Sequence, residues 1–454
     1  MLKPRIEKTH HTLITDGVPE HEQTLMASKP FWVLFVANLG VGTWLMGVLV
    51  AKMHLDTQRG LVALFIGSVV GSILPALTAL LGPRSRLSQM EAGRFSLGKT
   101  GKKIPAVLNW VGAIGWDVIN NLISASALLL FLSEWGIDTP FWLALAFLVV
   151  VQAIIGVYGH HMIQETSRFT GILLAFFFIV IGILSMKVGG LPHSQGGPPP
   201  RTEFLSALIL ITIYNISGWT TYTADYTRYL PKNTASRHVF LGIFLALFLS
   251  LALLGFFGYM TASTVEEETP RGVMLALQKL TGSFSPLVLL LVGFSAIPAN
   301  AVNDNSAAYS LISSGFRVSR PSAAVIGALS GFLVCLLASH AFIEFYENFL
   351  LLFAHWIAPW AAVILVHWFI NGKKELKTPP GITAGCVIFF LVSIASLLLF
   401  SSNPVYSGPV PLRIGGLDIG PFFGFVTAGV LYFFLLTRQT RGGIEYVGKG
   451  KRIE

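Results

Sequence analysis

Long apolar stretches recur along the whole chain and are separated by short polar segments. A helix of about 20 apolar residues is long enough to cross a hydrocarbon core about 30 Å thick. The pattern therefore predicts an all-α polytopic membrane protein with about 12 transmembrane helices. The predicted spans are 30–51, 60–82, 104–133, 139–159, 168–187, 203–224, 238–262, 284–303, 322–339, 342–370, 381–401 and 419–437.

Composition and charge agree with a membrane protein. Only 12% of the residues are charged and 53% are hydrophobic, whereas soluble domains are about a quarter charged. The net charge of +9 could indicate nucleic-acid binding, but 24 of the 31 Lys and Arg lie in segments that face the cytoplasm if the N-terminus does. This is the positive-inside bias. We expect no nucleic-acid partner, both termini in the cytoplasm and a plasma-membrane (cell inner membrane) location.

The ends of the chain are polar. Residues 1–29 are predicted to be a short disordered cytoplasmic tail, and residues 438–454 a second cytoplasmic tail. Between them lies one transmembrane domain, 30–437. The external segment 263–280 is predicted to form a short amphipathic helix, and the Pro/Gly-rich loop 189–201 to divide two halves of the domain.

Two spans share a polar motif. Span one contains NLGVGTW, from Asn38 to Trp44, and span six contains NISGWTT, from Asn215 to Thr221. The two spans run in opposite directions, so the motifs indicate an inverted-repeat transporter, with repeats at about 30–187 and 203–370 and extra helices at 381–437. Unwound backbone at 38–43 and 215–220 would then line a cavity. The alternative is close helix packing, which we favour for GALSG at 327–331.

Span three carries an aromatic and an amide on one helix face. Trp116 and Asn120 are four residues apart and therefore neighbours. An indole beside a carboxamide suits a planar heteroaromatic ligand, which stacks on the ring and hydrogen-bonds along its edge. Interhelical packing is the alternative. Asp117 lies on a neighbouring face, where an ionisable residue is expected to be functional, as a proton carrier or as a partner for Lys or Arg.

Two further polar groups occur at the ends of spans. The segment SAIPANAVNDNSAAYS closes span eight, and Pro298 is predicted to break the helix there. The polar residues that follow, Asn300, Asn303, Asp304 and Asn305, are expected to face a cavity or the cytoplasmic mouth. At the end of span six, Asp225 and Arg228 are three residues apart and are predicted to form an ion pair at the inner interface.

No pattern in the sequence indicates catalysis. There is no nucleophile–base pair and no Cys/His spacing that would suit a metal. The segment GRFSLGKT, from Gly93 to Thr100, fits the spacing of a phosphate-binding loop, but it lies between membrane spans and follows no strand. We interpret it as a basic interfacial loop. The chain is predicted not to be an enzyme and to need no cofactor.

At this point the sequence resembles a known family. GPRSRLSQMEAGRFSLGKTGKKIPAVLNWVGAIGWDVIN (82–120), ADYTRYLP (224–231) and NDN (303–305) are similar to segments of the purine–cytosine permeases, which belong to nucleobase–cation symporter family 1. The resemblance implies a LeuT-type fold of five plus five inverted spans and two C-terminal helices. It also implies a small heteroaromatic substrate between spans one, three, six and eight.

The resemblance also implies roles for single residues. Trp116 is similar to the family's stacking tryptophan, Asn120 to the amide of the purine–cytosine members, and Asn303 to the amide that binds the base. The family's second stacking ring falls at Ile216 in this chain, so Trp219 or Tyr214 would have to supply it. The complete set of predicted substrate-binding residues is Gly40, Trp116, Asn120, Ile216, Ser217, Trp219 and Asn303.

The coupling ion is predicted from a difference between this chain and the sodium-coupled members of the family. Sodium-coupled members carry hydroxyl side chains just before the span-eight Asn, where this chain has Ala301 and Val302. Hard cations require oxygen ligands. Proton coupling is therefore predicted in preference to sodium coupling, with Asp117 or Asp304 as the carrier.

These features predict a secondary active importer of a nucleobase-like heterocycle such as cytosine or a purine. The same fold could instead carry a vitamin precursor of the hydroxymethylpyrimidine, thiamine or pyridoxine type, or allantoin or a hydantoin. A channel or a non-transporting receptor is the alternative from another class, although the polar residues cluster near mid-depth and do not form a continuous stripe. The lipid bilayer and the substrate are the expected partners, with no obligate protein partner.

Overall fold

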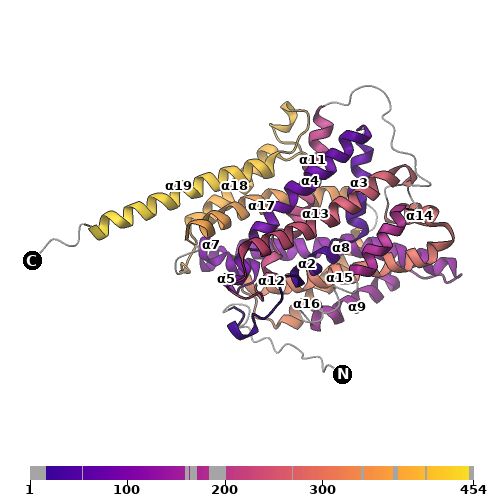
Figure 1. Cartoon of the computed structure of the whole chain (residues 1–454), viewed down its shortest axis with the longest axis horizontal. Coiled ribbons are helices and arrows are strands. Elements are labelled where there is room, and N and C mark those ends of the chain that lie inside the picture. Colours follow the sequence, from indigo (N-terminus) through magenta and orange to yellow (C-terminus); the bar gives the residue numbers. More distant parts are fainter. Residues whose placement is uncertain are drawn as a thin grey trace, which may run out of the picture.

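A computed structural model describes residues 17–53, 55–158, 163, 171–183, 201–267, 269–338, 342–371, 377–403 and 406–448. The described chain is a bundle of long helices, several of which run side by side (Figure 1). The helices of the first half are α2 (Lys29–Ala37), α3 (Val41–Lys52), α4 (Thr57–Thr78), α5 (Leu81–Ser85), α6 (Gln89–Ala92), α7 (Arg94–Gly101), α8 (Lys103–Glu134) and α9 (Phe141–Tyr158).

The second half begins with α11 (Arg201–Trp219) and α12 (Thr223–Thr227). It continues with α13 (Ser236–Thr261), α14 (Pro270–Thr281), α15 (Ser285–Ser313), α16 (Arg320–Ala338) and α17 (Phe342–Asn371). The chain ends with α18 (Ala384–Phe400) and α19 (Gly420–Gly448). The predicted amphipathic helix within 263–280 is present as α14, whereas the predicted dividing loop lies outside the described residues up to position 200.

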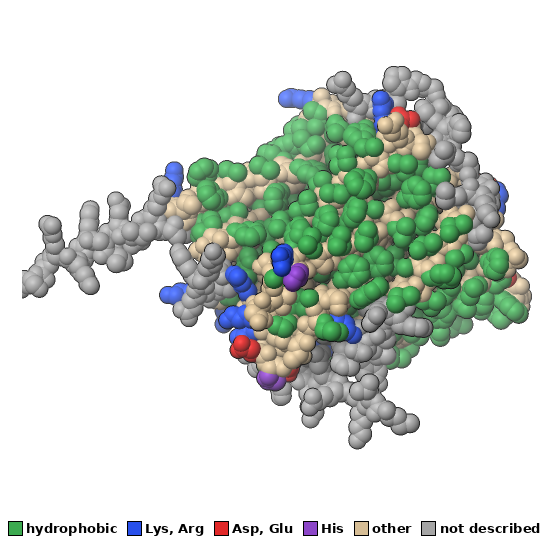
Figure 2. Space-filling view, in the orientation of Figure 1, with side chains coloured by type: hydrophobic (Ala, Val, Ile, Leu, Met, Phe, Trp, Pro, Cys, Tyr) green, Lys and Arg blue, Asp and Glu red, His purple; other side chains and the backbone are tan. Residues whose placement is uncertain are grey.

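Among the described residues, seven helices are long and apolar enough to cross a membrane, or eight if the bent pair α2–α3 is one span. Three shorter apolar helices, Phe141–Ile155, Gly171–Ile183 and Ala384–Phe400, fall on predicted spans four, five and eleven. The total of 12 remains a prediction. The visible surface is a broad belt of hydrophobic side chains, with the charged groups mostly near its margins (Figure 2). Such a surface matches a lipid environment.

The N-terminal part of the described chain is more ordered than predicted. Val18 is buried and its N–H donates to the carbonyl of Arg86. The buried Gln23 amide donates to the carbonyls of Pro83, Arg228 and Leu230, each at 3.0 Å. The prediction of a disordered tail is therefore wrong for residues 17–29, because a polar side chain satisfies loop carbonyls there. At the other end, α19 continues past residue 437 and extends from the bundle (Figure 1).

The predicted interruption of span one is present. Helix α2 ends at Ala37, α3 begins at Val41, and the two are bent by 57°. Gly40 adopts an extended conformation between them. The hydroxyl of Thr43 donates to the backbone carbonyl of Asn38, so a side chain satisfies a carbonyl exposed by the break. Irregular backbone at membrane depth requires such internal partners.

The interruption of span six lies further along the chain than predicted. Helix α11 continues through Asn215 to Trp219, and the non-helical residues are 220–222. The hydroxyl of Thr78 donates to the carbonyl of Thr220, and the N–H of Ala224 donates to Oε1 of Gln89. These two backbone groups would bond each other in a continuous helix. Side chains from α4 and α6 therefore decide where the helix breaks.

Pro298 does not break span eight, contrary to prediction, because α15 is continuous from Ser285 to Ser313. A proline removes one hydrogen bond from a membrane helix, and neighbouring helices can stabilise the rest. Helix α15 packs along α8 over much of its length. This pairing, together with contacts of α11 with α4 and of α13 with α3 and α4, sets the centre of the bundle.

Glycines allow α3 and α13 to approach closely. A Cβ added at Gly258 would lie 1.8 Å from the carbonyl oxygen of Trp44, and one added at Gly47 would lie 1.9 Å from that of Gly255. The two glycines are thus required by space, as in other membrane helix pairs.

We expect Gly258→Ala to lower the amount of folded protein, because the added methyl group collides with rigid backbone rather than a flexible side chain. Detergent-solubilised abundance measured by fluorescence-detected size exclusion tests this. Gly381→Ala is the matched control, since no atom lies within 4 Å of the Cβ that it adds. Equal monodisperse yields of the two variants would contradict the packing argument.

Candidate substrate-binding site

Two adjoining cavities, each of about 20 Å³, lie at the centre of the bundle. They share the lining residues Ala37, Asn120, Tyr214 and Ala299. These come from α2, α8, α11 and α15, which correspond to predicted spans one, three, six and eight. A cavity of this size holds about one water molecule. A planar heterocycle can therefore enter only if the surrounding helices separate.

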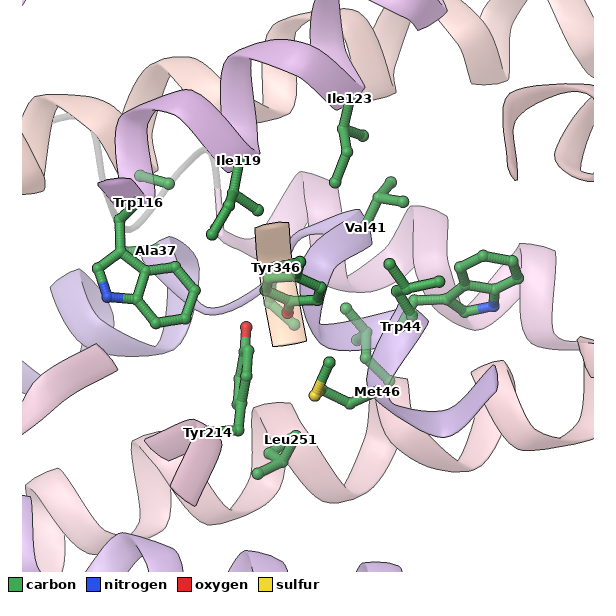
Figure 3. Packing of buried hydrophobic residues seen from close by; sticks show 14 of the residues in the cluster. Ala37, Val41, Trp44, Met46, Trp116, Ile119, Ile123, Tyr214, Leu251 and Tyr346 are labelled. Atoms are coloured by element: carbon green, nitrogen blue, oxygen red, sulfur yellow. The ribbon is translucent and has the colours of Figure 1, made fainter. Parts of the chain in front are cut away.

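Aromatic side chains form much of the wall of one of these cavities, which both Trp116 and Trp219 line. The Trp116 ring meets Tyr214 edge to face, with centroids 5.7 Å apart, and the two approach from different helices (Figure 3). A Cβ added at Gly218 would lie 3.3 Å from the Trp116 ring, so glycine keeps that side of the indole accessible.

Amide side chains form the polar part of the wall. The amide nitrogen of Asn120 donates to Oδ1 of Asn300 at 2.8 Å, and that of Asn303 lies 3.5 Å from the same oxygen. Asn300 in turn donates to Gln152 at 3.0 Å. These bonds orient Asn120 and Asn303 and use one N–H of each amide. Their carbonyl oxygens can therefore accept hydrogen bonds from N–H groups of a ligand.

The two motifs that suggested the repeat meet at this site. The side chain of Asn38 donates to Ser250 at 2.8 Å and approaches Oδ1 of Asn215 at 3.4 Å. Its own Oδ1 accepts from the indole N–H of Trp219 at 3.1 Å. Asn38 therefore holds Trp219 in place across the two broken spans. Gly40 lines the other cavity, the one that the two indoles do not line.

Ile216 and Ser217 do not line either cavity, unlike the other predicted substrate-binding residues. Ile216 belongs to a separate apolar cluster that includes Trp356 and Trp360 of α17. The hydroxyl of Ser217 donates to the carbonyl of Leu350. Because α11 is still helical here, Tyr214 and Gly218 share the cavity face and the residues between them point elsewhere. Unwound backbone, as predicted for 215–220, would not have shown this periodicity.

The predicted ion pair between Asp225 and Arg228 is also absent, although both residues are buried. Asp225 accepts hydrogen bonds from the N–H of Gln89 and the hydroxyl of Ser306, both at 2.7 Å. The Arg228 guanidinium lies over the rings of Tyr309 and Tyr229, at 4.3 and 4.9 Å. Direct donors satisfy the carboxylate and cation–π contacts hold the guanidinium, so the two charges attract each other without forming a direct ion pair.

Asp117 and Asp304 are fully buried and line neither cavity. Neither forms a salt bridge with Lys or Arg in the described part of the chain. The pairing of Asp117 with a basic residue, considered as one possibility from the sequence, is therefore not observed.

Apolar helices, a broken first span, a broken sixth span and polar groups gathered at both breaks define a multi-pass membrane transporter. The sequence model of the family described as "Permease for cytosine/purines, uracil, thiamine, allantoin" matches residues 17–385. The chain belongs to this permease family. The family resemblance is thus confirmed, as is the expectation of a transporter rather than an enzyme.

Full-length relatives support this assignment. The chain is 25% identical to YxlA of Bacillus subtilis, covering 95% of this chain and 97% of that protein. It is also 25% identical to the purine-cytosine permease fcyB of Emericella nidulans, with 92% and 87% coverage. The vitamin B6 transporter TPN1 of Saccharomyces cerevisiae is 22% identical, over 72% of this chain and 59% of TPN1.

Solved structures confirm the fold class. Mhp1, a nucleobase-cation-symport-1 family transporter with bromovinylhydantoin bound, superposes with a TM-score of 0.76 at 18% identity. The match covers 94% of this chain and 95% of Mhp1. At this identity the likeness concerns the fold alone. A sodium-coupled sialic acid symporter superposes less well, with a TM-score of 0.62 at 15% identity.

Proposed function

We propose that the protein imports a nucleobase-like heterocycle, cytosine or a purine, across the plasma membrane by proton-coupled alternating access, with both termini in the cytoplasm. The observation that carries the proposal is the joint lining of one cavity by two indoles, Trp116 and Trp219, and two amides, Asn120 and Asn303. Flat rings stack on indoles, and amide oxygens accept from ring N–H and amino groups.

The chemistry of the site favours nucleobases over simple aromatic compounds. Its amides are held by a buried hydrogen-bond network, so a ligand that lacks polar edges would leave them unpaired at a cost of about 1–3 kcal/mol each. The similarity to fcyB supports a purine or cytosine. A pyridoxine-type vitamin is the second candidate, because TPN1 is also a relative.

Alternating access is supported by hydrogen bonds that join three helices at one end of the bundle. Gln89 binds both Ala224 and Asp225, and Ser306 binds Asp225. These contacts tie α6, α12 and α15 together on the side where the sequence places the cytoplasm. Opening towards the cytoplasm would have to break them, and the small central cavity would widen as the helices separate.

Thermal-shift screening of the purified protein tests the substrate class. We expect cytosine, adenine or hypoxanthine to raise the unfolding temperature, because a ligand that binds only the folded state stabilises it. Pyridoxine, a hydantoin and benzene-carboxamide serve as comparisons. A shift with pyridoxine alone would replace nucleobases by the second candidate, and the absence of any shift would contradict the assignment.

Uptake into proteoliposomes tests transport and coupling. We expect accumulation above the external concentration in sodium-free buffer with an inward proton gradient, and its collapse when a protonophore is added. A channel would only equilibrate the solute. Strict dependence on sodium would contradict proton coupling while leaving the transporter assignment intact.

A further inference from the structure

Two aspartates of the central helices share one buried location. Asp117 on α8 and Asp304 on α15 are both 0% exposed. Both side chains lie against α16, and each carboxyl group is within electrostatic range of the other. None of the four carboxyl oxygens accepts a hydrogen bond of ordinary geometry from a described N–H or O–H group. The polar neighbours of the two carboxyl groups are therefore each other and, for Asp117, the amide of Asn303.

Helix α16 covers this pair with its glycine face. A Cβ added at Gly327 would lie 3.6 Å from Oδ1 of Asp304, and one added at Gly331 would lie 3.4 Å from Cβ of Asp117. The titratable groups facing the pair are Tyr222, before α12, and Cys335 on α16. Both are neutral at ordinary pH. No described Lys, Arg or His acts on either carboxyl group.

Two negative charges are unfavourable in this place. Burying one ionised carboxylate in a membrane interior costs at least about 2.5 kcal/mol, and a second like charge in contact adds repulsion. Two carboxyl groups in such contact can instead share a proton, as paired carboxylates do elsewhere. A hard cation such as Mg²⁺ or Ca²⁺ would want six or more oxygen ligands. The described surroundings offer mainly these two groups.

The pair is joined to the proposed substrate site through the chain. Asp117 directly follows Trp116, and Asp304 directly follows Asn303. The amide of Asn303 also interacts with Asp117, and Asn300 donates to the backbone carbonyl of Asp117 at 3.4 Å. A ligand that shifts the backbone at Trp116 or Asn303 would therefore also shift the adjoining carboxyl group.

We propose that Asp117 and Asp304 together form the proton-binding site of this transporter, holding one exchangeable proton between them. The two aspartates do not line the substrate cavity, but each directly follows one of its binding residues in the chain. Substrate binding changes the distance between the carboxyl groups and so changes their hold on the proton. The proposal rests on the transport function proposed above and assigns its coupling to a pair of residues.

Asp304→Asn and Asp117→Asn test the proposal in proteoliposomes. An amide has the shape of a protonated carboxyl and can donate a hydrogen bond to the remaining partner, so each variant mimics the proton-loaded pair. We expect both variants to exchange labelled for unlabelled cytosine across the membrane but to stop at the equilibrium level in a proton gradient. Asp138→Asn, at an exposed position, is the matched control and should accumulate substrate normally.

A direct proton measurement completes the test. In weakly buffered solution, cytosine added to the wild-type protein should change the pH of the medium, and the two variants should show no such change. Wild-type accumulation and an unaltered pH response in both variants would overturn the proposal. If the wild-type protein neither exchanges cytosine nor shows a thermal shift with it, the proposed function itself is rejected. A variant that does not fold is recognised by its low abundance and by the absence of exchange. The other variant then tests the proposal.

Discussion

Asn303→Ala is expected to abolish cytosine uptake while the protein remains in the membrane at wild-type abundance. Asn303 lines the cavity and is oriented by the Asn300 amide. Removing a buried amide leaves the donors of the ligand unpaired, at a cost of about 1–3 kcal/mol. That corresponds to a loss of about five- to 150-fold in affinity. Initial uptake rates, normalised to membrane abundance, measure the effect.

Asn109→Ala is the matched control for Asn303→Ala. Asn109 is also a buried amide between α8 and α15, donating to Ser310 at 2.8 Å, but it lines neither cavity. Its loss should lower thermal stability and leave the KM for cytosine unchanged. Wild-type uptake by Asn303→Ala, or an equal loss in both variants, would contradict a role in binding the base.

The second large effect is expected at Trp116. Trp116→Ala should raise the apparent KM strongly and Trp116→Phe mildly, because phenylalanine retains a stacking ring. Aromatic pairs contribute about 0.5–1.5 kcal/mol beyond their buried area, and alanine also removes that area. The contacts of Trp116 with Tyr214 and Phe349 would be lost in the alanine variant as well. Concentration-dependent uptake by both variants measures the difference.

Trp360→Phe provides the comparison for Trp116→Phe. Trp360 of α17 is fully buried in the apolar cluster that also contains Ile216 and lines neither cavity, so its substitution should leave the KM unchanged. If Trp116→Ala transported cytosine with a wild-type KM, the ring would not stack on the substrate. Trp219 would then be the remaining indole of the cavity.

The predicted site residues differ in how far their position follows from the local sequence. Trp116 and Asn120 line the same cavity because both lie on one continuous helix, where a spacing of four residues fixes a common face. Ile216, which the family resemblance suggested, and Ser217 line neither cavity, because their segment remains helical and its cavity face is that of Tyr214 and Gly218. The Asp225–Arg228 pair was predicted from spacing alone, which carries no information about Gln89, Ser306 or the tyrosines that bind these two residues instead.

The sequence by itself determined the membrane class, the positions of the long helices and the family, because apolar length and periodicity are local properties that the bilayer imposes on each segment. It also located the break of span one. Only the tertiary structure decided where span six breaks, that Pro298 leaves α15 intact, and that Asp117 and Asp304 meet. Each of these features depends on whether another helix supplies a partner for a buried polar group. No local sequence pattern encodes such a partner.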